Sequence, residues 1–184
     1  MFFARVPSAL DVERFLTDCR ERPLSYSGSG PAGFQIDTET TNLGAGQRTF
    51  VLAVRALQAW RHFDLGWVRV FPPDAPLAAG VVVAVRIKHM SFWSLNGCRV
   101  ASVFGSEHER SFGFTYRTLT NHAECGEETF TLVWDAATDA VSYTIHAISR
   151  PRSIVTKLGF PYVRVLQGRF RRDSAQVLRQ VIGA

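Results

Sequence analysis

The sequence predicts an α+β fold in which a curved antiparallel β-sheet grips a long C-terminal helix, with short helices near the N-terminus. Three observations predict it. Five successive segments between residues 81 and 150 alternate apolar and polar residues with a period of two. Short polar turns separate several of them, most clearly DAATDA. The last segment repeats its apolar residues at helical spacing, so it is able to cover the apolar face of the sheet.

The N-terminal part predicts helix, strand and helix in that order. SALDVERFLTDCRER reads as a helix that Ser8 and Asp11 cap and that ends before Pro23. FQIDTETTNLG alternates with period two and predicts a strand. GQRTFVLAVRALQAWRHFDLG repeats apolar residues every three to four positions, so it predicts one long helix that Gly66 ends.

The loop between the first helix and the first strand contains a formal GxGxxG motif from Gly28 to Gly33. A dinucleotide-binding fingerprint needs a strand before it and a helix after it, because the helix N-terminus binds the pyrophosphate. Here Pro31 interrupts the motif, and a strand-like segment follows it. The sequence therefore argues against nucleotide binding by this loop.

The remaining elements complete the predicted sheet and its helix. WVRVFPPDAPLAAG begins extended and breaks at Pro72-Pro73. The strands that follow are VVVAVRIK, GCRVASVFG, RSFGFTYRTL, EETFTLVWD and AVSYTIHAISR. The final segment predicts a short helical lead at 153–158 and then a long helix with Pro161 in its first turn. Its apolar stripe is Tyr162, Leu166, Phe170, Val177 and Val181.

This order of elements is that of the helix-grip arrangement of START-like and pollen-allergen-like proteins, in which sheet and helix enclose a cavity. A closed lipocalin-like barrel is the alternative, but such a barrel does not need the middle helix. We expect residues 1–22 to form an N-terminal helical extension and residues 23–184 to form a single helix-grip domain. A chain of 184 residues with 46% hydrophobic and 20% charged residues suits this size.

Composition limits the class of protein. The three cysteines lie far apart and form no CxxC pair, which argues against a disulfide framework or a cysteine zinc site. No apolar run reaches the roughly 20 residues of a membrane helix, and the N-terminus lacks the apolar core of a signal peptide. We therefore expect a cytoplasmic protein that does not insert into membranes. No cofactor is expected, and the oligomeric state stays open.

Positive charge gathers at the C-terminus. The net charge is +5, and eight basic residues and one acidic residue lie between Arg150 and the end of the chain. Such a tail attracts phosphates or anionic surfaces, or is a solvated helix face. It lacks the exposed aromatic residues and glycine-rich loops that nucleic-acid binders add, so the sequence argues against nucleic acid.

Several segments together resemble one uncharacterised family. They are WRHFDLGWVRVFPPDAP, FWSLNGCRV, GFTYRTLTNHAECGEETFTLVWD, ISRP and LQGRFRRDSAQVLR. They are similar to the bacterial and plant family called domain of unknown function 1990, from about Pro23 to the C-terminus. The family hairpin typically reads like GFAYGTLPGHPESGEERF, from which this chain departs at Arg117, Thr120, Asn121, Ala123 and Cys125. The resemblance implies a START-like fold and a cavity, and it implies no particular reaction or ligand.

The predicted cavity gives the main functional hypothesis, which is the binding of a small, largely apolar molecule between sheet and helix. Large rings on one face of the sheet would form its walls: Trp60, Trp93, Phe112, Phe114, Tyr116, Phe130 and Trp134. Polar groups would orient the ligand: Asn96, Arg99, His122 and Glu128. Arg99 has the geometry to bind a carboxylate or phosphate with two hydrogen bonds.

Glu128 is the first candidate for chemistry. Period-two alternation places it on the same side of its strand as Phe130 and Leu132. A carboxylate on an apolar wall has a raised pKa, which suits a general acid or base. The alternative is structural, because Glu128 is able to pair with a cation on a neighbouring strand such as Arg99.

His122 and Cys125 lie around the predicted turn that precedes Glu128. A histidine at a cavity rim can bind an anion or transfer protons, although exposed turn histidines are common. A Cys125–His122 dyad would need the thiol next to the imidazole, and the family usually has Ser at this position. His89, His122 and His146 are able to join Glu128 as metal ligands, but no spacing requires it, and we predict no metal.

Two further hypotheses stay open. One is an enzyme that uses the same cavity, with Glu128 or His122 transferring a proton. The other is an interaction protein that presents its basic C-terminal helix to an acidic partner. In the second case affinity should fall steeply as salt rises.

Overall fold

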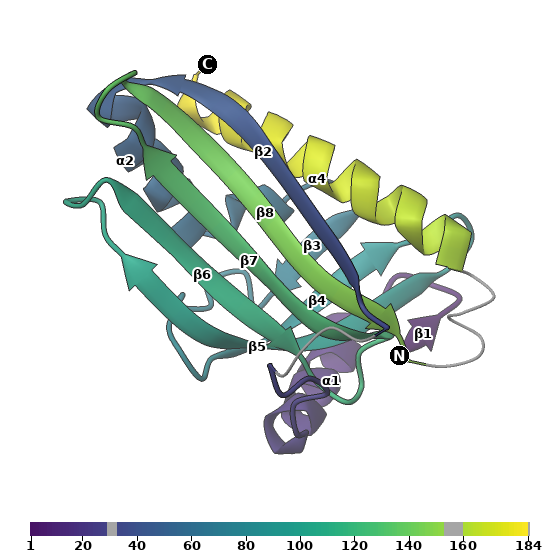
Figure 1. Ribbon diagram of the computed structural model, residues 1–184. Coiled ribbons are helices and arrows are strands. Elements are labelled where there is room, and N and C mark those ends of the chain that lie inside the picture. Colours follow the sequence, from purple (N-terminus) through teal and green to yellow (C-terminus); the bar gives the residue numbers. More distant parts are fainter. Residues whose placement is uncertain (29–32, 153–159, 184) are drawn as a thin grey trace.

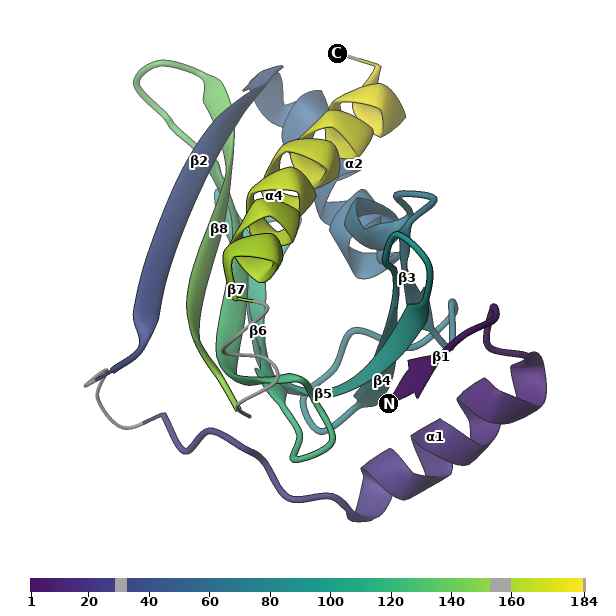
Figure 2. The same ribbon diagram turned by 90° about the vertical axis from the view of Figure 1, so that its right-hand side faces the viewer.

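The computed structural model describes residues 1–28, 33–152 and 160–183 of the 184-residue chain. One antiparallel sheet curls into a half-barrel, and the long helix α4 (Phe160–Ile182) runs along its concave side (Figure 1). Seen after a quarter turn, the strands curve around α4 on one side, while helix α1 (Ala9–Glu21) lies outside the sheet (Figure 2). The predicted fold, a curved sheet that grips a C-terminal helix, is confirmed.

Seven strands form the continuous path of the sheet, in the order β2-β8-β7-β6-β5-β4-β3, and a short β1 (Phe2–Phe3) pairs with β5 outside this path. The strands are β2 (Gln35–Ala45), β3 (Val68–Phe71), β4 (Val82–Lys88), β5 (Trp93–Gly105), β6 (Ser111–Thr118), β7 (Glu124–Trp134) and β8 (Ala140–Pro151). Each predicted strand is present. β5 and β7 begin earlier than the sequence indicated, so Trp93 and Cys125 belong to strands.

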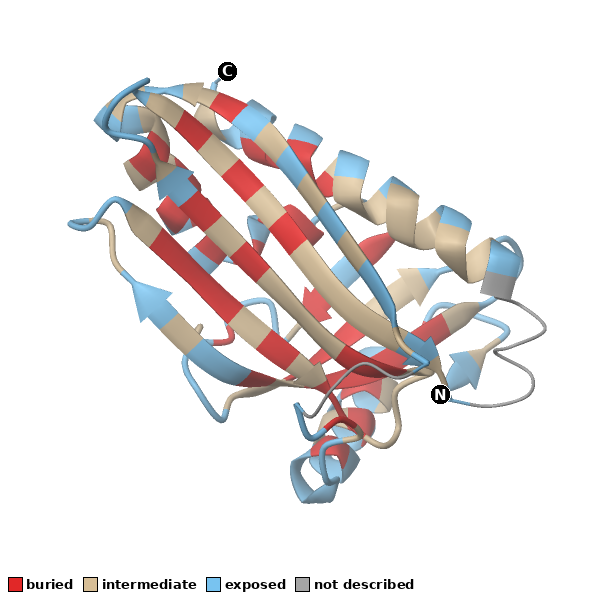
Figure 3. Ribbon diagram, viewed as in Figure 1, coloured by how far each residue is buried: buried red, intermediate tan, exposed pale blue. Residues whose placement is uncertain are grey.

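The concave face of the sheet carries the large apolar side chains. Buried positions alternate with half-buried ones in the first half of β8 and in the second half of β6 (Figure 3). On β7, Phe130 and Leu132 are buried on the same face. Phe114 and Phe130 are Cα partners on β6 and β7, and their rings stack with centroids 4.9 Å apart. Tyr116 faces Glu128 one pair further along the same face. Because side chains alternate between the two faces of a strand, this register fixes which groups can meet α4.

Helix α2 (Gly46–Gln58) is shorter than predicted. The helix predicted to reach Gly66 ends at Gln58, and a 3₁₀ turn (Arg61–Phe63) follows it. Trp60 lies between them with a left-handed backbone, φ 56°. Its indole is buried against Phe114 and donates a hydrogen bond from Nε1 to the carbonyl of Ala75 at 2.9 Å. Burial of this large ring offsets the backbone cost, so tertiary packing overrides the helical pattern.

Helix α4 has two halves that differ in how they contact the sheet. In its C-terminal half, Ala175 and Leu178 are buried in the core. In its N-terminal half, Leu166 and Phe170 are only half-buried. The predicted stripe needs one correction, because Val181 is 40% exposed and Leu178 takes its place. The stripe continues in steps of four residues through Ser174, whose hydroxyl lies 2.9 Å from that of Tyr143.

Helix α1 packs against the convex face of the sheet. Ser8 caps it, and Asp11 completes a capping box, as predicted. Phe15 and Cys19 are buried with Leu95 of β5 in a second, smaller apolar cluster. Within the described residues, no helix is both long and apolar enough to cross a membrane. The predicted helical lead at 153–158 and most of the GxGxxG loop, at 29–32, lie outside those residues.

Candidate functional site

A pocket of about 340 Å³ lies between the sheet and the N-terminal half of α4. One side is apolar and comes from the 3₁₀ turn and from β3 and β4, including Phe63, Val68 and Ile87. The helix contributes Tyr162, Leu166 and Phe170. The opposite side comes from β5 to β8 and carries polar groups. The pocket therefore joins a largely apolar volume to a polar wall, as small-molecule sites usually do.

Glu128 and Tyr116 form the central pair of the polar wall. The hydroxyl of Tyr116 donates a hydrogen bond to Glu128 Oε2, and both side chains line the pocket. Burial raises the pKa of Glu128 to about 7, although the bond from Tyr116 opposes the rise. The raised pKa follows from loss of hydration of the charged form. A carboxyl group of this kind is able both to accept and to donate a proton near neutral pH.

His122 and Glu124 form a second polar group at the start of β7. The backbone N–H of Glu124 donates to His122 Nδ1 at 2.9 Å, so that nitrogen is an acceptor. Burial lowers the pKa of His122 to about 4, which keeps the ring neutral at physiological pH. Glu124 Oε1 accepts hydrogen bonds from Gln167 of α4 at 2.9 Å and from Ser149 of β8 at 3.4 Å. Burial also raises the pKa of Glu124.

A third polar group lies at the end of the pocket near β1. Asn96 donates from Nδ2 to Ser94 Oγ at 2.9 Å, and His89 Nε2 lies 2.9 Å from the same hydroxyl. The ring of His89 stacks on Phe92 with centroids 4.3 Å apart. His89 Nδ1 is buried and has no hydrogen-bond partner in the structure as described. Burial lowers the pKa of His89, because it disfavours the charged form of the ring.

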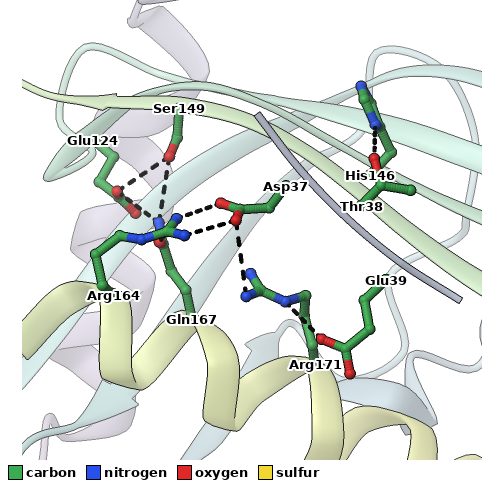
Figure 4. Close-up of polar contacts among 9 residues, drawn as sticks. All are labelled: Asp37, Thr38, Glu39, Glu124, His146, Ser149, Arg164, Gln167 and Arg171. Carbon is green, nitrogen blue, oxygen red and sulfur yellow. Dashed lines mark hydrogen bonds and ion pairs between the residues drawn. The ribbon is translucent and has the colours of Figure 1, made fainter. Parts of the chain in front are cut away.

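Charged side chains join α4 to the edge strand β2 beside the pocket (Figure 4). Arg164 donates two hydrogen bonds to Asp37, one of them from Nη2 to Oδ1 at 2.7 Å. Arg171 donates from Nε to Glu39 Oε2 at 3.0 Å. The hydrogen bond from Arg164 lowers the pKa of Asp37. These basic residues of the tail thus face the sheet, where they hold the N-terminal half of α4.

The residues predicted for the cavity divide into three groups. Asn96, Tyr116, His122 and Glu128 line the pocket. The second group does not line it but packs in the main apolar core: Trp60, Phe112, Phe114, Phe130 and Trp134. The indole of Trp134 lies at the edge of that core and donates from Nε1 to Asp139 Oδ1 at 2.7 Å.

The third group, Trp93 and Arg99, lies on the convex face and corrects the predicted site. Both have the opposite strand parity to Asn96, so their side chains point away from α4. Arg99 Nη2 donates to the carbonyls of Arg20 and Arg22, at 3.1 and 3.3 Å. The alternative of a structural bridge between Arg99 and Glu128 is excluded for the same reason. Instead, the guanidinium of Arg86 lies over the ring of Trp93, with Cζ 5.2 Å from the ring centroid.

Cys125 and His146, which the sequence analysis weighed as a possible nucleophile and a possible metal ligand, both make other contacts. Cys125 donates from Sγ to the carbonyl of Ser25 at 2.9 Å. His146 lies on the face of β8 opposite to Glu128 and contacts Thr38, with Nδ1 2.8 Å from Oγ1. Among the residues that the structure describes, no three side chains of His, Cys, Asp or Glu come together to hold a metal ion.

His62 was not predicted and is the most unusual group near the pocket. It is fully buried among Trp60, Phe63 and Phe130, and neither ring nitrogen has a hydrogen-bond partner among the described residues. Burial lowers its pKa to about 3. In the sequence, the large apolar residues Trp60 and Phe63 on either side of His62 indicate that this histidine is buried. The pattern also missed Gln167, a polar residue beside the apolar stripe of α4 that contacts Glu124.

The comparisons with known proteins agree on family and fold. The sequence profile described as "Domain of unknown function (DUF1990)" matches residues 19–177. A UPF0548 protein of Dictyostelium discoideum is 32% identical over 209 residues, which cover 100% of this chain and 97% of the relative.

Two solved structures give the fold. Zhui aromatase/cyclase from Streptomyces has a TM-score of 0.55 at 8% identity, over 82% of this chain and 94% of that chain. A Thalictrum norcoclaurine synthase point mutant, in complex with a transition-state analogue, has a TM-score of 0.54 at 10% identity, over 85% of this chain and 100% of that chain. At such identities the likeness shows the helix-grip fold alone. By the matched profile and the Dictyostelium relative, the chain belongs to the family Domain of unknown function (DUF1990).

Proposed function

We propose that the protein binds a small, largely apolar molecule in the pocket between the sheet and the N-terminal half of α4. The observation that carries the proposal is the pocket itself, about 340 Å³ in volume, at the place where the helix does not close on the sheet. Its volume lies within the range of small-molecule sites. The complex of the norcoclaurine synthase neighbour with a transition-state analogue supports a ligand-binding use of this fold.

The contrast within α4 supports the same proposal. Leu178 in the C-terminal half is fully buried in the core, whereas Leu166 and Phe170 in the N-terminal half border the pocket. A protein that needed only a stable core would gain free energy by filling this space, because burial of apolar surface stabilises the fold. An open volume at a fixed place in the fold is therefore better explained by a ligand than by stability.

Native mass spectrometry of protein purified from its own host tests the proposal first. We expect a bound small molecule that is released when the protein unfolds. The neutral dye Nile red gives a second test, because its fluorescence rises in an apolar site. Ala147→Phe places a ring in the pocket from β8 and should abolish the dye signal. Ala136→Phe, in the exposed turn after β7, is the matched control and should leave it unchanged. Equal dye binding by both variants would contradict the proposal.

A second candidate function is catalysis of a proton transfer in the same pocket. The observation that favours it is the contact between Tyr116 and Glu128, together with the pKa of about 7 for Glu128. A proton-transfer group works best when its pKa lies near the working pH. If the protein is an enzyme, Glu128→Gln should abolish turnover of the native ligand even at saturating ligand concentration, while the fold persists. A binding protein would release that ligand chemically unchanged.

A further inference from the structure

Within the described parts of the chain, the cations that border the pocket have ion-pair partners, whereas one of its carboxyl groups does not. Of the cations near it, Arg164 and Arg171 point to Asp37 and Glu39 on β2, as Figure 4 shows. Glu128, by contrast, receives a hydrogen bond only from the neutral hydroxyl of Tyr116 among the described residues. The pocket therefore contains a carboxyl group without an ion-pair partner in that part of the chain.

Glu128 also lies next to a second acidic group. Glu124 lines the same wall, and its contacts within the described residues come from the neutral groups Gln167 and Ser149. The charge of Glu124 further raises the pKa of Glu128, and that of Arg171 lowers it. Two half-buried carboxyl groups in one wall favour a positively charged occupant, because each loses hydration and gains little from its neutral partners.

The rings beside Glu128 suit the same occupant. Tyr116, Phe63 and Phe170 form a continuous aromatic wall, with centroid distances of 6.1 Å between Tyr116 and Phe63 and 5.0 Å between Phe63 and Phe170. All three line the pocket. Aromatic faces attract an ammonium group through their negative quadrupole, and they also contact an apolar body.

We propose that the pocket selects molecules that carry a protonated amine at one end of an apolar body, with the ammonium against Glu128. This inference rests on the proposed binding function and names the class of ligand. The ammonium donates to the carboxylate of Glu128 in place of lost water, and the apolar body extends between Phe63, Ile87 and Leu166. An anionic ligand of the same shape adds a like charge next to Glu124 and Glu128, which disfavours its binding.

Three probes with one carbon skeleton test the inference on the full-length protein: 4-phenylbutylamine, 4-phenylbutan-1-ol and 4-phenylbutanoate. Isothermal titration calorimetry at about pH 8 compares them, since the amine and Glu128 are then both charged. We expect the amine to bind about tenfold or more tightly than the alcohol, and the carboxylate to bind most weakly. Equal affinities for the amine and the alcohol would overturn the inference, and so would the absence of binding by all three probes. These measurements on the unmutated protein are sufficient for that conclusion.

Glu128→Gln then assigns the preference to one residue. The amine should lose its advantage in this variant, while the affinity for the alcohol stays within about twofold and so reports an intact pocket. Glu107→Gln is the control, since Glu107 pairs with Arg55 on the surface and does not line the pocket. A preference for the amine that persists in Glu128→Gln contradicts the assignment. Nile red binding without any preference for the amine would reject this inference alone, whereas absence of dye binding would reject the proposed function as well.

Discussion

The hydroxyl of Tyr116 donates a hydrogen bond to the carboxylate of Glu128 inside the pocket. The two residues are Cα partners on β6 and β7, so the sheet register sets their distance. Glu128 is therefore held in place by a neighbour that carries no charge. Its ionised form is stabilised by that bond and destabilised by burial, and burial has the larger effect.

The first prediction concerns pH and Glu128. Its pKa rises from 4.5 in the unfolded chain to about 7 in the native protein, so the native state binds more protons between these values. The contribution of Glu128 to stability is therefore lost as pH rises through about 7. Glu128→Gln should therefore be more stable, relative to the native protein, at pH 8 than at pH 5. The difference in free energy of unfolding between variant and native protein should be about 2–3 kcal/mol larger at pH 8.

Urea unfolding of both proteins at the two pH values measures this difference. Glu107→Gln removes a charge from an exposed ion pair and serves as the control, with the same difference from the native protein at both pH values. An unchanged pH dependence in Glu128→Gln would show that this carboxyl group titrates normally.

The second prediction concerns His62. Burial lowers its pKa, so its effect on stability changes with pH in the opposite direction to that of Glu128. Burial holds its pKa at about 3, against 6.5 in the unfolded chain. The unfolded chain therefore binds the extra proton as pH falls below about 6.5, and the native state loses stability. His62→Leu removes two buried nitrogens that have no hydrogen-bond partner in the described part of the chain. It should stabilise the fold by about 1–2 kcal/mol at pH 8, and by more at pH 5.

Thermal unfolding at both pH values provides the test. His108→Leu changes an exposed histidine in the β5–β6 turn and should leave the unfolding temperature nearly constant. A destabilised His62→Leu protein at both pH values would mean that the imidazole has a required role in the aromatic core.

The third prediction concerns the ion pairs between α4 and β2. Asp37→Asn removes the charge that Arg164 contacts and leaves a partly buried guanidinium without its anion. Relative to the native protein, we expect amide hydrogen exchange to become faster in residues 160–170 than in residues 174–182. Ala175 and Leu178 are buried in the apolar core, whereas Leu166 and Phe170 are only partly buried against it. The free energy of unfolding should fall by about 1–2 kcal/mol. Asp64→Asn, in an exposed pair with Arg61, is the matched control. A uniform change along α4 would exclude a separately held N-terminal half.

The fourth prediction separates Arg99 from the pocket. Arg99→Ala removes hydrogen bonds to the C-terminal carbonyls of α1 on the convex face. Stability should fall by about 1 kcal/mol, and the affinity for Nile red should not change. Urea unfolding and dye titration measure the two effects on one sample. If a stably folded variant bound the dye more weakly, Arg99 would contribute to the binding site, and this prediction would be wrong.

The sequence predicted part of the site and failed at identifiable places. Tyr116 and Glu128 were placed on one concave face because period-two alternation and a short hairpin fix the relation between neighbouring strands. Trp93 and Arg99 lie on the convex face, contrary to the prediction. The predicted strand began at Gly97, so its alternation did not include Asn96 or Trp93, whereas β5 begins at Trp93. The contact of Asp37 with Arg164 joins residues 127 positions apart, and no local pattern encodes it.

The end of α2 shows the same limit. The spacing of apolar residues continues through Trp60, and Gly66 is a plausible helix end. The chain leaves the helix earlier because the indole of Trp60 finds a buried place against Phe114, which is 54 residues away. Burial of a large ring outweighs the helical preference of a few residues, and that balance depends on the complete core.

The sequence by itself determined the order of helices and strands and the face of β6 and β7 that holds the rings, because alternation and helical spacing are local properties of the chain. Tertiary structure alone decided that α4 closes on the sheet in one half and leaves a pocket in the other. The physical reason is that the closure depends on which side chains of distant segments meet: Leu178 reaches the core, while Arg164 and Gln167 hold the helix at β2 and β7 by polar contacts.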